Sequence, residues 1–156
     1  MELRSTNGSF SGRRISGSFV IETSNAQVTI EDGDLNLSVS TTNNAITTTE
    51  STLFGSENYM KTSNARILCD ALLPETGVFE IMTTNGQVNL LVDDSLKAEF
   101  DASTTNGSVN LKDLMVAVTS STSTSMKGNL NGGNGLLITL KTSNSNIMIE
   151  NRRSDD

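Results

Sequence analysis

One eight-residue pattern recurs along the chain, and this repeat constrains the fold more than any other feature. TTNGQVNL at residues 83–90 and TTNGSVNL at residues 104–111 are almost identical. Looser copies share their central asparagine, which occurs as Asn7, Asn25, Asn43, Asn64, Asn85, Asn106 and Asn144. A degraded copy, STSMKGNL, places Ser125 at the asparagine position between the last two. The copies then follow one another every 18–21 residues, and such a period indicates a repeat architecture.

Each copy has the pattern of a strand, a bend and a second strand. Apolar residues alternate with polar ones on both sides of the asparagine, which is the period of a half-buried strand. Even offsets before the asparagine and odd offsets after it are apolar, so these positions are predicted to face the core. They include Phe19, Ile21, Val28, Ile30, Leu37, Val39, Ile67, Cys69, Phe79, Ile81, Val88, Leu90, Val109, Leu111, Ile138, Leu140, Ile147 and Ile149.

The repeat predicts an all-β fold in which successive windings of the chain lie on top of one another. A single winding cannot bury its apolar face, whereas stacked windings share a continuous core. We therefore expect residues 1–156 to form one β-solenoid domain, a flattened β-helix or roll of about eight rungs. A repetitive antiparallel β-sandwich is the alternative, because its strands also recur at short and regular spacing.

The motif asparagines are expected at the corners of the rungs. Asn tolerates left-handed backbone angles, and Gly8, Gly86 and Gly107 directly follow it in three copies. Stacked rungs would bring each asparagine about 4.8 Å from the next, so that the amides could form a ladder. Threonines two places earlier face inward and could stack in the same way: Thr23, Thr41, Thr62, Thr83, Thr104 and Thr142.

Hydroxyl residues one place before the asparagine face outward and form a possible binding row. They are Ser24, Thr42, Ser63, Thr84, Thr105 and Ser143. Such a row could contact a carbohydrate or order water, as in ice-binding proteins. Ice-binding surfaces use two outward threonines separated by one residue, and here the second position varies from Glu22 to Lys61 and Met82. This irregularity disfavours ice binding.

The composition argues against catalysis. The chain has no His, which is the commonest general base and metal ligand, and Cys69 is predicted to be a buried core residue. Asp32, Asp34 and Asp93 lie in connectors, where Asp is favoured by turn chemistry alone. We assign no catalytic, cofactor-binding or metal-binding residues. A polysaccharide-active enzyme stays an alternative, because it needs only two opposed carboxyl groups in a cleft.

Charge and hydropathy exclude further classes of partner. The formal net charge of −7 disfavours nucleic acid, which requires a basic surface. No apolar run is long enough to span a bilayer, and MELRSTNG lacks the apolar segment of a signal peptide. The expected partners are a second copy, through end-to-end or edge pairing, other domains of a longer protein, or a carbohydrate. The compartment is left open.

The motifs IETSNAQVTI, MTTNGQVNL, STTNGSVNL and KTSNSNIMIE resemble those of adhesin-type domains of unknown function from bacteria, archaea and fungi. These families repeat T-S-N-G or T-S-N-A units at a similar period. The resemblance covers nearly the whole chain and implies a β-solenoid surface or scaffold domain without established catalytic residues. It also favours an extracellular or cell-surface location. We therefore expect a non-enzymatic structural or adhesive module. The alternative is a carbohydrate-binding module that uses the Ser/Thr/Asn face or the acidic connectors.

Overall fold

The computed structural model describes residues 1–133 and 135–152, and the secondary structure of these residues consists of strands. The sixteen strands are β1 Glu2–Ser5, β2 Phe10–Arg13, β3 Ser16–Thr23, β4 Val28–Glu31, β5 Asp34–Ser40, β6 Ile46–Leu53, β7 Glu57–Lys61, β8 Ile67–Leu72, β9 Gly77–Met82, β10 Val88–Val92, β11 Ala98–Ser103, β12 Val109–Lys112, β13 Val116–Ser121, β14 Ser125–Leu130, β15 Leu136–Lys141 and β16 Ile147–Asn151. No described segment is a helix that could cross a membrane.

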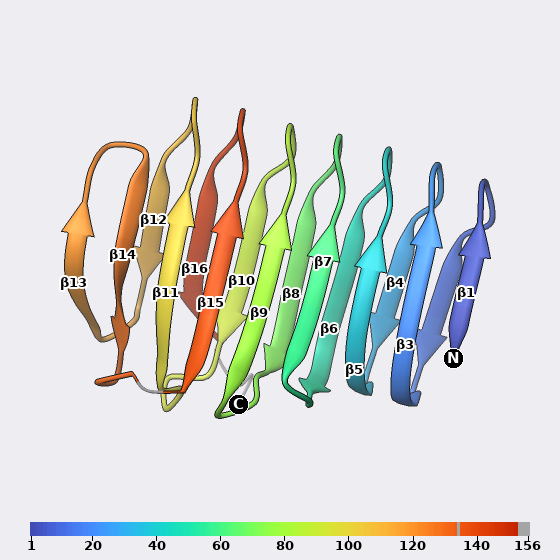
Figure 1. Cartoon of the computed structure of the whole chain (residues 1–156), viewed down its shortest axis with the longest axis horizontal. Coiled ribbons are helices and arrows are strands. Elements are labelled where there is room, and N and C mark those ends of the chain that lie inside the picture. Colours follow the sequence, from blue (N-terminus) through green and yellow to red (C-terminus); the bar gives the residue numbers. More distant parts are fainter. Residues whose placement is uncertain (134, 153–156) are drawn as a thin grey trace.

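The strands wind into two facing sheets, and the predicted β-solenoid is confirmed (Figure 1). One sheet has the order β1-β3-β5-β7-β9-β15-β11-β14-β13, and the other has the order β2-β4-β6-β8-β10-β16-β12. Pairing between neighbouring rungs is parallel, for example between β8 and β10, so the antiparallel sandwich does not describe this chain. The end of β6 crosses to the first sheet, where Thr52 pairs with Asp34 of β5.

The rungs do not stack in chain order. Numbered along the chain, rungs one to six are β1/β2, β3/β4, β5/β6, β7/β8, β9/β10 and β11/β12, and rung seven is β15/β16. Rung seven lies between rungs five and six, because β15 pairs with both β9 and β11, and β16 pairs with both β10 and β12 (Figure 1). The expectation that consecutive motif copies are neighbours therefore holds only as far as rung five.

The predicted eighth corner, at Ser125, is not a corner. Ser125 instead begins β14, which runs antiparallel to β11 on one side and to β13 on the other. The turn before it is closed by the backbone N–H of Thr122, which donates to the carbonyl of Ser125 at 2.8 Å. This copy lacks both the asparagine and the following Val/Ile, so it cannot extend the stack. The described residues form seven rungs and one terminal hairpin.

The core lies between the two sheets and consists of the inward positions of each rung. Phe79, Ile81, Val88 and Leu90 of rung five are fully buried. Val109 and Leu111 are only partly buried, although they occupy equivalent positions, because β12 is the last strand of its sheet and no rung covers it. The position of a rung in the stack, and not in the sequence, therefore decides how deeply its apolar residues are buried.

Asn58 interrupts the apolar pattern at an inward position and repairs a gap in the strand pairing. Its side chain is 3% exposed, and its Oδ1 accepts a hydrogen bond from the backbone N–H of Leu37 at 2.8 Å. Its Nδ2 donates to the carbonyl of Phe54 at 3.0 Å. The regular pairing of β5 with β7 starts only at Ser38 and Tyr59. The Asn58 amide thus replaces a ladder bond that the crossing end of β6 interrupts.

Thr48 is a second polar residue in the core, and its hydroxyl has no hydrogen-bond partner within the described residues. It is fully buried in the column between Ile30 and Cys69. Burying an unpaired hydroxyl costs about 1–3 kcal/mol. We therefore expect Thr48→Val to raise the free energy of unfolding by about 1–2 kcal/mol in urea denaturation. Thr47→Val, on the outward face, is the control, and an equal effect there would contradict the assignment.

Candidate functional site

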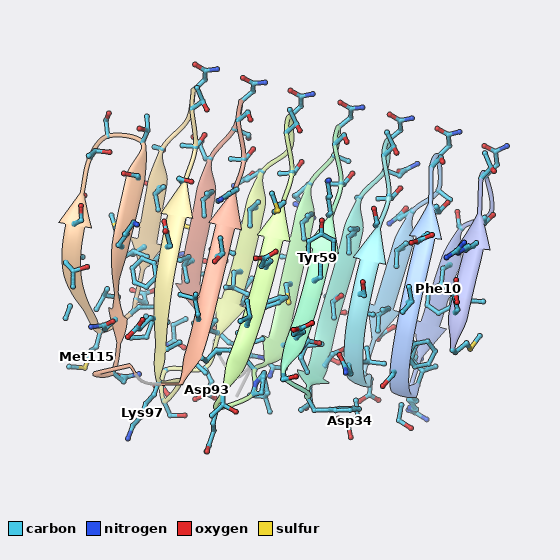
Figure 2. The ribbon with its side chains drawn as sticks, viewed as in Figure 1. Phe10, Asp34, Tyr59, Asp93, Lys97 and Met115 are labelled. Carbon is cyan, nitrogen blue, oxygen red and sulfur yellow. The ribbon has the colours of Figure 1, made fainter. Side chains whose placement is uncertain are left out.

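The seven motif asparagines form one continuous hydrogen-bonded row, which we call the asparagine ladder. The row runs in the order Asn7, Asn25, Asn43, Asn64, Asn85, Asn144 and Asn106, and from Asn25 onward each Nδ2 donates to the Oδ1 of the preceding member at 2.7–2.9 Å. The amides lie on the bends that join the two sheets, and Figure 2 shows this row along the upper margin of the molecule. The ladder follows the spatial order of the rungs and passes from Asn85 to Asn144 before Asn106.

Backbone hydrogen bonds hold the asparagines in register. The N–H of Asn64 donates to the carbonyl of Thr42 at 3.0 Å, and the N–H of Asn85 donates to that of Ser63 at 2.9 Å. None of the motif asparagines has a positive φ, so the expected left-handed corner is wrong. Gly86 instead allows close approach, because a Cβ there would lie 1.7 Å from the carbonyl oxygen of Ala65.

The inward threonines tie the rungs together from inside the bend, but they do not bond to one another. The Oγ1 of Thr83 donates to the carbonyl of Ala65 at 3.1 Å, and the Oγ1 of Thr142 donates to that of Gly86 at 2.9 Å. Thr41, Thr62 and Thr104 make equivalent bonds. The Oγ1 of Thr23 has no partner within the described part of the chain. The repeated hydroxyls therefore brace the backbone of neighbouring rungs.

The outer row presents its hydroxyl groups to solvent beside the asparagine ladder. Ser24, Thr42, Thr84 and Thr105 are exposed, and two further members, Ser63 and Ser143, are half-exposed. The row follows the order of the stack, so its members recur at the strand spacing of about 4.8 Å. The structure therefore aligns these six residues along one edge of the solenoid.

Interior members of the asparagine ladder should contribute more stability than its terminal members. Asn64 donates one amide bond and accepts another, whereas Asn7 shares only one bond with its neighbour. Net contributions are about 0.5–1.5 kcal/mol for each hydrogen bond. We expect Asn64→Ala to lower the free energy of unfolding by about 1–2 kcal/mol and Asn7→Ala by about half of that. Chemical denaturation of both variants checks the prediction, and equal losses would contradict a cooperative ladder.

Side chains that could act as nucleophiles or metal ligands are either buried or dispersed over the surface. Cys69 is fully buried, and desolvation raises the pKa of its thiol far above the usual range, with a smaller contribution from the charge of Asp70. Within residues 1–133 and 135–152, no group of three or more His, Cys, Asp or Glu side chains could hold a metal ion. The arrangement therefore supplies neither an activated nucleophile at Cys69 nor a clustered set of ligands.

A surface hollow of about 560 Å³ lies between two connectors at the edge opposite the asparagine ladder. It is lined by Leu72, Leu73, Glu75, Thr76, Asp93, Ser95, Leu96 and Lys97. Figure 2 shows Asp93 and Lys97 at this lower margin. The hydroxyl and the backbone N–H of Ser95 donate to Asp93 and hold the pKa of its carboxyl group below the usual value. The hollow thus includes Asp93, from one of the acidic connectors that the sequence suggested for carbohydrate.

The sequence did not single out Asn58 or Arg152. Asn58 could have been found because, like Thr48, it is a polar residue at an inward position that is apolar in most other rungs. Arg152 forms an ion pair with Asp70 at 2.6 Å, and both side chains are about one-fifth exposed. It follows the last strand and joins rung seven to rung four, which no local pattern could indicate.

A family model described as Toastrack DUF4097 matches residues 1–150 of the chain. The chain belongs to the Toastrack DUF4097 family. Among solved structures, this Toastrack domain is similar to one described as a putative cell adhesion protein from Clostridium sporogenes ATCC 15579. That match covers 97% of this chain and 92% of the other at 9% identity and a TM-score of 0.43. No curated protein matches the sequence.

Proposed function

We propose that this Toastrack domain is a non-enzymatic structural module that acts as a stiff spacer and displays adhesive surfaces. The supporting observation is the asparagine ladder, which runs unbroken through all seven rungs. The residues that repeat most regularly are engaged in holding rungs together. This use of the polar repeat suits a scaffold better than a catalytic site.

Stiffness can be tested by the distance between two labelled rungs. Gln27 of rung two directly precedes β4, Asn110 of rung six lies in β12 of the same sheet, and both side chains are exposed. Five strand spacings separate their rungs in the observed stack, so the labels should lie about 24 Å apart along the axis. Spin labels on Gln27→Cys/Asn110→Cys are expected to give one narrow distance distribution. A broad distribution in a folded sample would refute the spacer.

Carbohydrate binding is the second candidate, because the outer row is exposed and evenly spaced. A glycan array would separate the two functions, since a pure spacer should give no more signal than an unrelated acidic protein. Binding that is lost in Thr42→Ala/Thr84→Ala would support the outer row as a carbohydrate site. Binding that is lost in Asp93→Asn/Lys97→Ala would instead assign it to the connector hollow. Release of sugars from a polysaccharide would contradict the non-enzymatic proposal.

A further inference from the structure

The two ends of the solenoid differ, and the end formed by rung one is open. Among the described residues, β1 pairs only with β3 and β2 pairs only with β4, so both strands present a free edge. Leu3 and Phe10 are only partly buried there, and Figure 2 shows Phe10 close to this end. A hollow of about 180 Å³ lies between the sheets, with Leu3, Phe10 and Ile21 in its lining. This end therefore exposes backbone groups and part of the core.

The opposite end is staggered in a way that prevents head-to-tail stacking. The β13–β14 hairpin extends one sheet by two strands beyond the level of β12, which ends the other sheet. The register of the hairpin also shifts between Val118 and Ser120, and such irregularities discourage pairing at an edge strand. In rung one both sheets end at the same level, whereas at the opposite end one sheet projects beyond the other. Rung one of a second copy therefore cannot extend both sheets at this staggered end. A second copy can match rung one only with its own rung one.

The pairing of β1 with β3 determines which backbone groups are available on the free edge. The N–H of Val20 donates to the carbonyl of Met1 at 2.9 Å. Along a strand, the backbone N–H and carbonyl groups of every second residue point to the same neighbouring strand. Met1, Leu3 and Ser5 therefore direct their backbone groups to β3. The N–H and carbonyl groups of Glu2 and Arg4 consequently point away from the solenoid. An added strand would form its ladder with these two residues.

The charges of β1 select one antiparallel register for such a strand. Three registers around the two-fold axis would place Glu2 opposite Glu2, Arg4 opposite Arg4, or Glu2 opposite Arg4. The first two oppose like charges, whereas the third forms two attractive pairs. In the third register Leu3 lies on the axis opposite Leu3 of the second copy. The sequence Glu-Leu-Arg is therefore self-complementary in an antiparallel pair.

We propose that rung one is a self-association surface on which a second copy of this chain pairs in this register to form a closed dimer. The N–H of Phe10 donates to the carbonyl of Gln27, so Ser11 and Arg13 are the outward-bonding residues of β2. Pairing Ser11 with Arg13 of the second copy keeps the two Arg13 side chains apart. The partly exposed Leu3 and Phe10 side chains of both copies would cover the open core. The dimer goes beyond the spacer function and is independent of carbohydrate binding.

Charge reversal tests the dimer in the full chain. Light scattering during gel filtration is expected to give twice the 16.6 kDa chain mass at high micromolar concentration. Glu2→Arg and Arg4→Glu should each raise the dimer dissociation constant at least about tenfold, because each opposes like charges across the axis. A mixture of the two variants should recover dimers, as should the double variant Glu2→Arg/Arg4→Glu. Recovery would also show that the single variants are folded.

Crosslinking provides a second readout that does not depend on charge. Leu3→Cys places a thiol on the proposed axis and should form a disulfide-linked dimer under mild oxidation, whereas native Cys69 is buried. Ser120→Cys, on the exposed edge of β13, is the matched control and should stay monomeric. A monomeric wild-type chain, a dimer that Glu2→Arg does not weaken, or preferential crosslinking through Ser120→Cys would each overturn the proposal.

Discussion

Replacing Val88 with aspartate is expected to unfold the domain or to lower its free energy of unfolding by at least about 3–5 kcal/mol. Val88 is fully buried and lies between Ile67 and Ile147 of the neighbouring rungs. A carboxylate at this position would be removed from water and placed between two apolar side chains. Thermal and urea denaturation, followed by circular dichroism, would measure the loss.

Gln87→Asp is the matched control for Val88→Asp, because Gln87 precedes Val88 and points to the outer face of the same rung. We expect this variant to unfold within about 0.5 kcal/mol of the wild type. Both substitutions add one negative charge to an already acidic chain. The difference between their free energies of unfolding therefore reports the effect of burial and not that of net charge. Similar stabilities for the two variants would show that the inward and outward positions have been wrongly assigned.

The inward and outward positions could be predicted from sequence because the alternation is local. Neighbouring residues of a strand point to opposite faces, and the bend at each asparagine shifts the phase by one residue in every rung. The spacing of the asparagines also indicated a stack. Their φ angles could not be predicted, because a residue that tolerates left-handed angles is not required to adopt them. Positive φ values occur instead in other connectors, as at Arg14 and Asp32, and at Glu50 within β6.

The order of the rungs could not be predicted, because every rung carries the same motif. Exchanging rungs six and seven leaves each strand pattern, each inward column and each asparagine in an equivalent place. The difference lies in the connectors. Asn131, after the hairpin, donates to the carbonyls of Asp94 and Leu96, which connect rung five to rung six. These contacts are long-range and leave no periodic signal in the sequence.

The candidate binding surfaces were partly foreseen. The outer row is regular enough to be found from spacing alone, whereas the hollow beside Asp93 and Lys97 depends on two connectors coming together in space. The open end at rung one was expected only as a general property of solenoids. The proposed pairing with a second copy follows from the direction of the backbone groups of Glu2 and Arg4, which could be derived only once the pairing of β1 was known.

Because rung seven lies between rungs five and six, a Leu→Ala substitution should cost more stability in rung seven than in rung six. Leu140 of rung seven is fully buried between Ile81 and Ala102, whereas Leu111 of rung six is only partly buried on the terminal strand β12. We expect Leu140→Ala to lower the free energy of unfolding by about 3–4 kcal/mol and Leu111→Ala by about 1 kcal/mol. A stack in chain order would give the opposite ranking, because rung six would then be interior and rung seven would be nearer the end.

Engineered cysteine pairs give a direct test of the same order. Met82 pairs with Lys141, and Lys141 pairs with Ser103, so Met82 and Ser103 are separated by an intervening strand. Met82→Cys/Lys141→Cys should therefore form a disulfide in the folded protein, since neighbouring strands lie about 4.8 Å apart. Met82→Cys/Ser103→Cys should not, because two strand spacings exceed the reach of a disulfide. Rapid oxidation of the second pair, with the first pair remaining reduced, would show that the rungs stack in chain order.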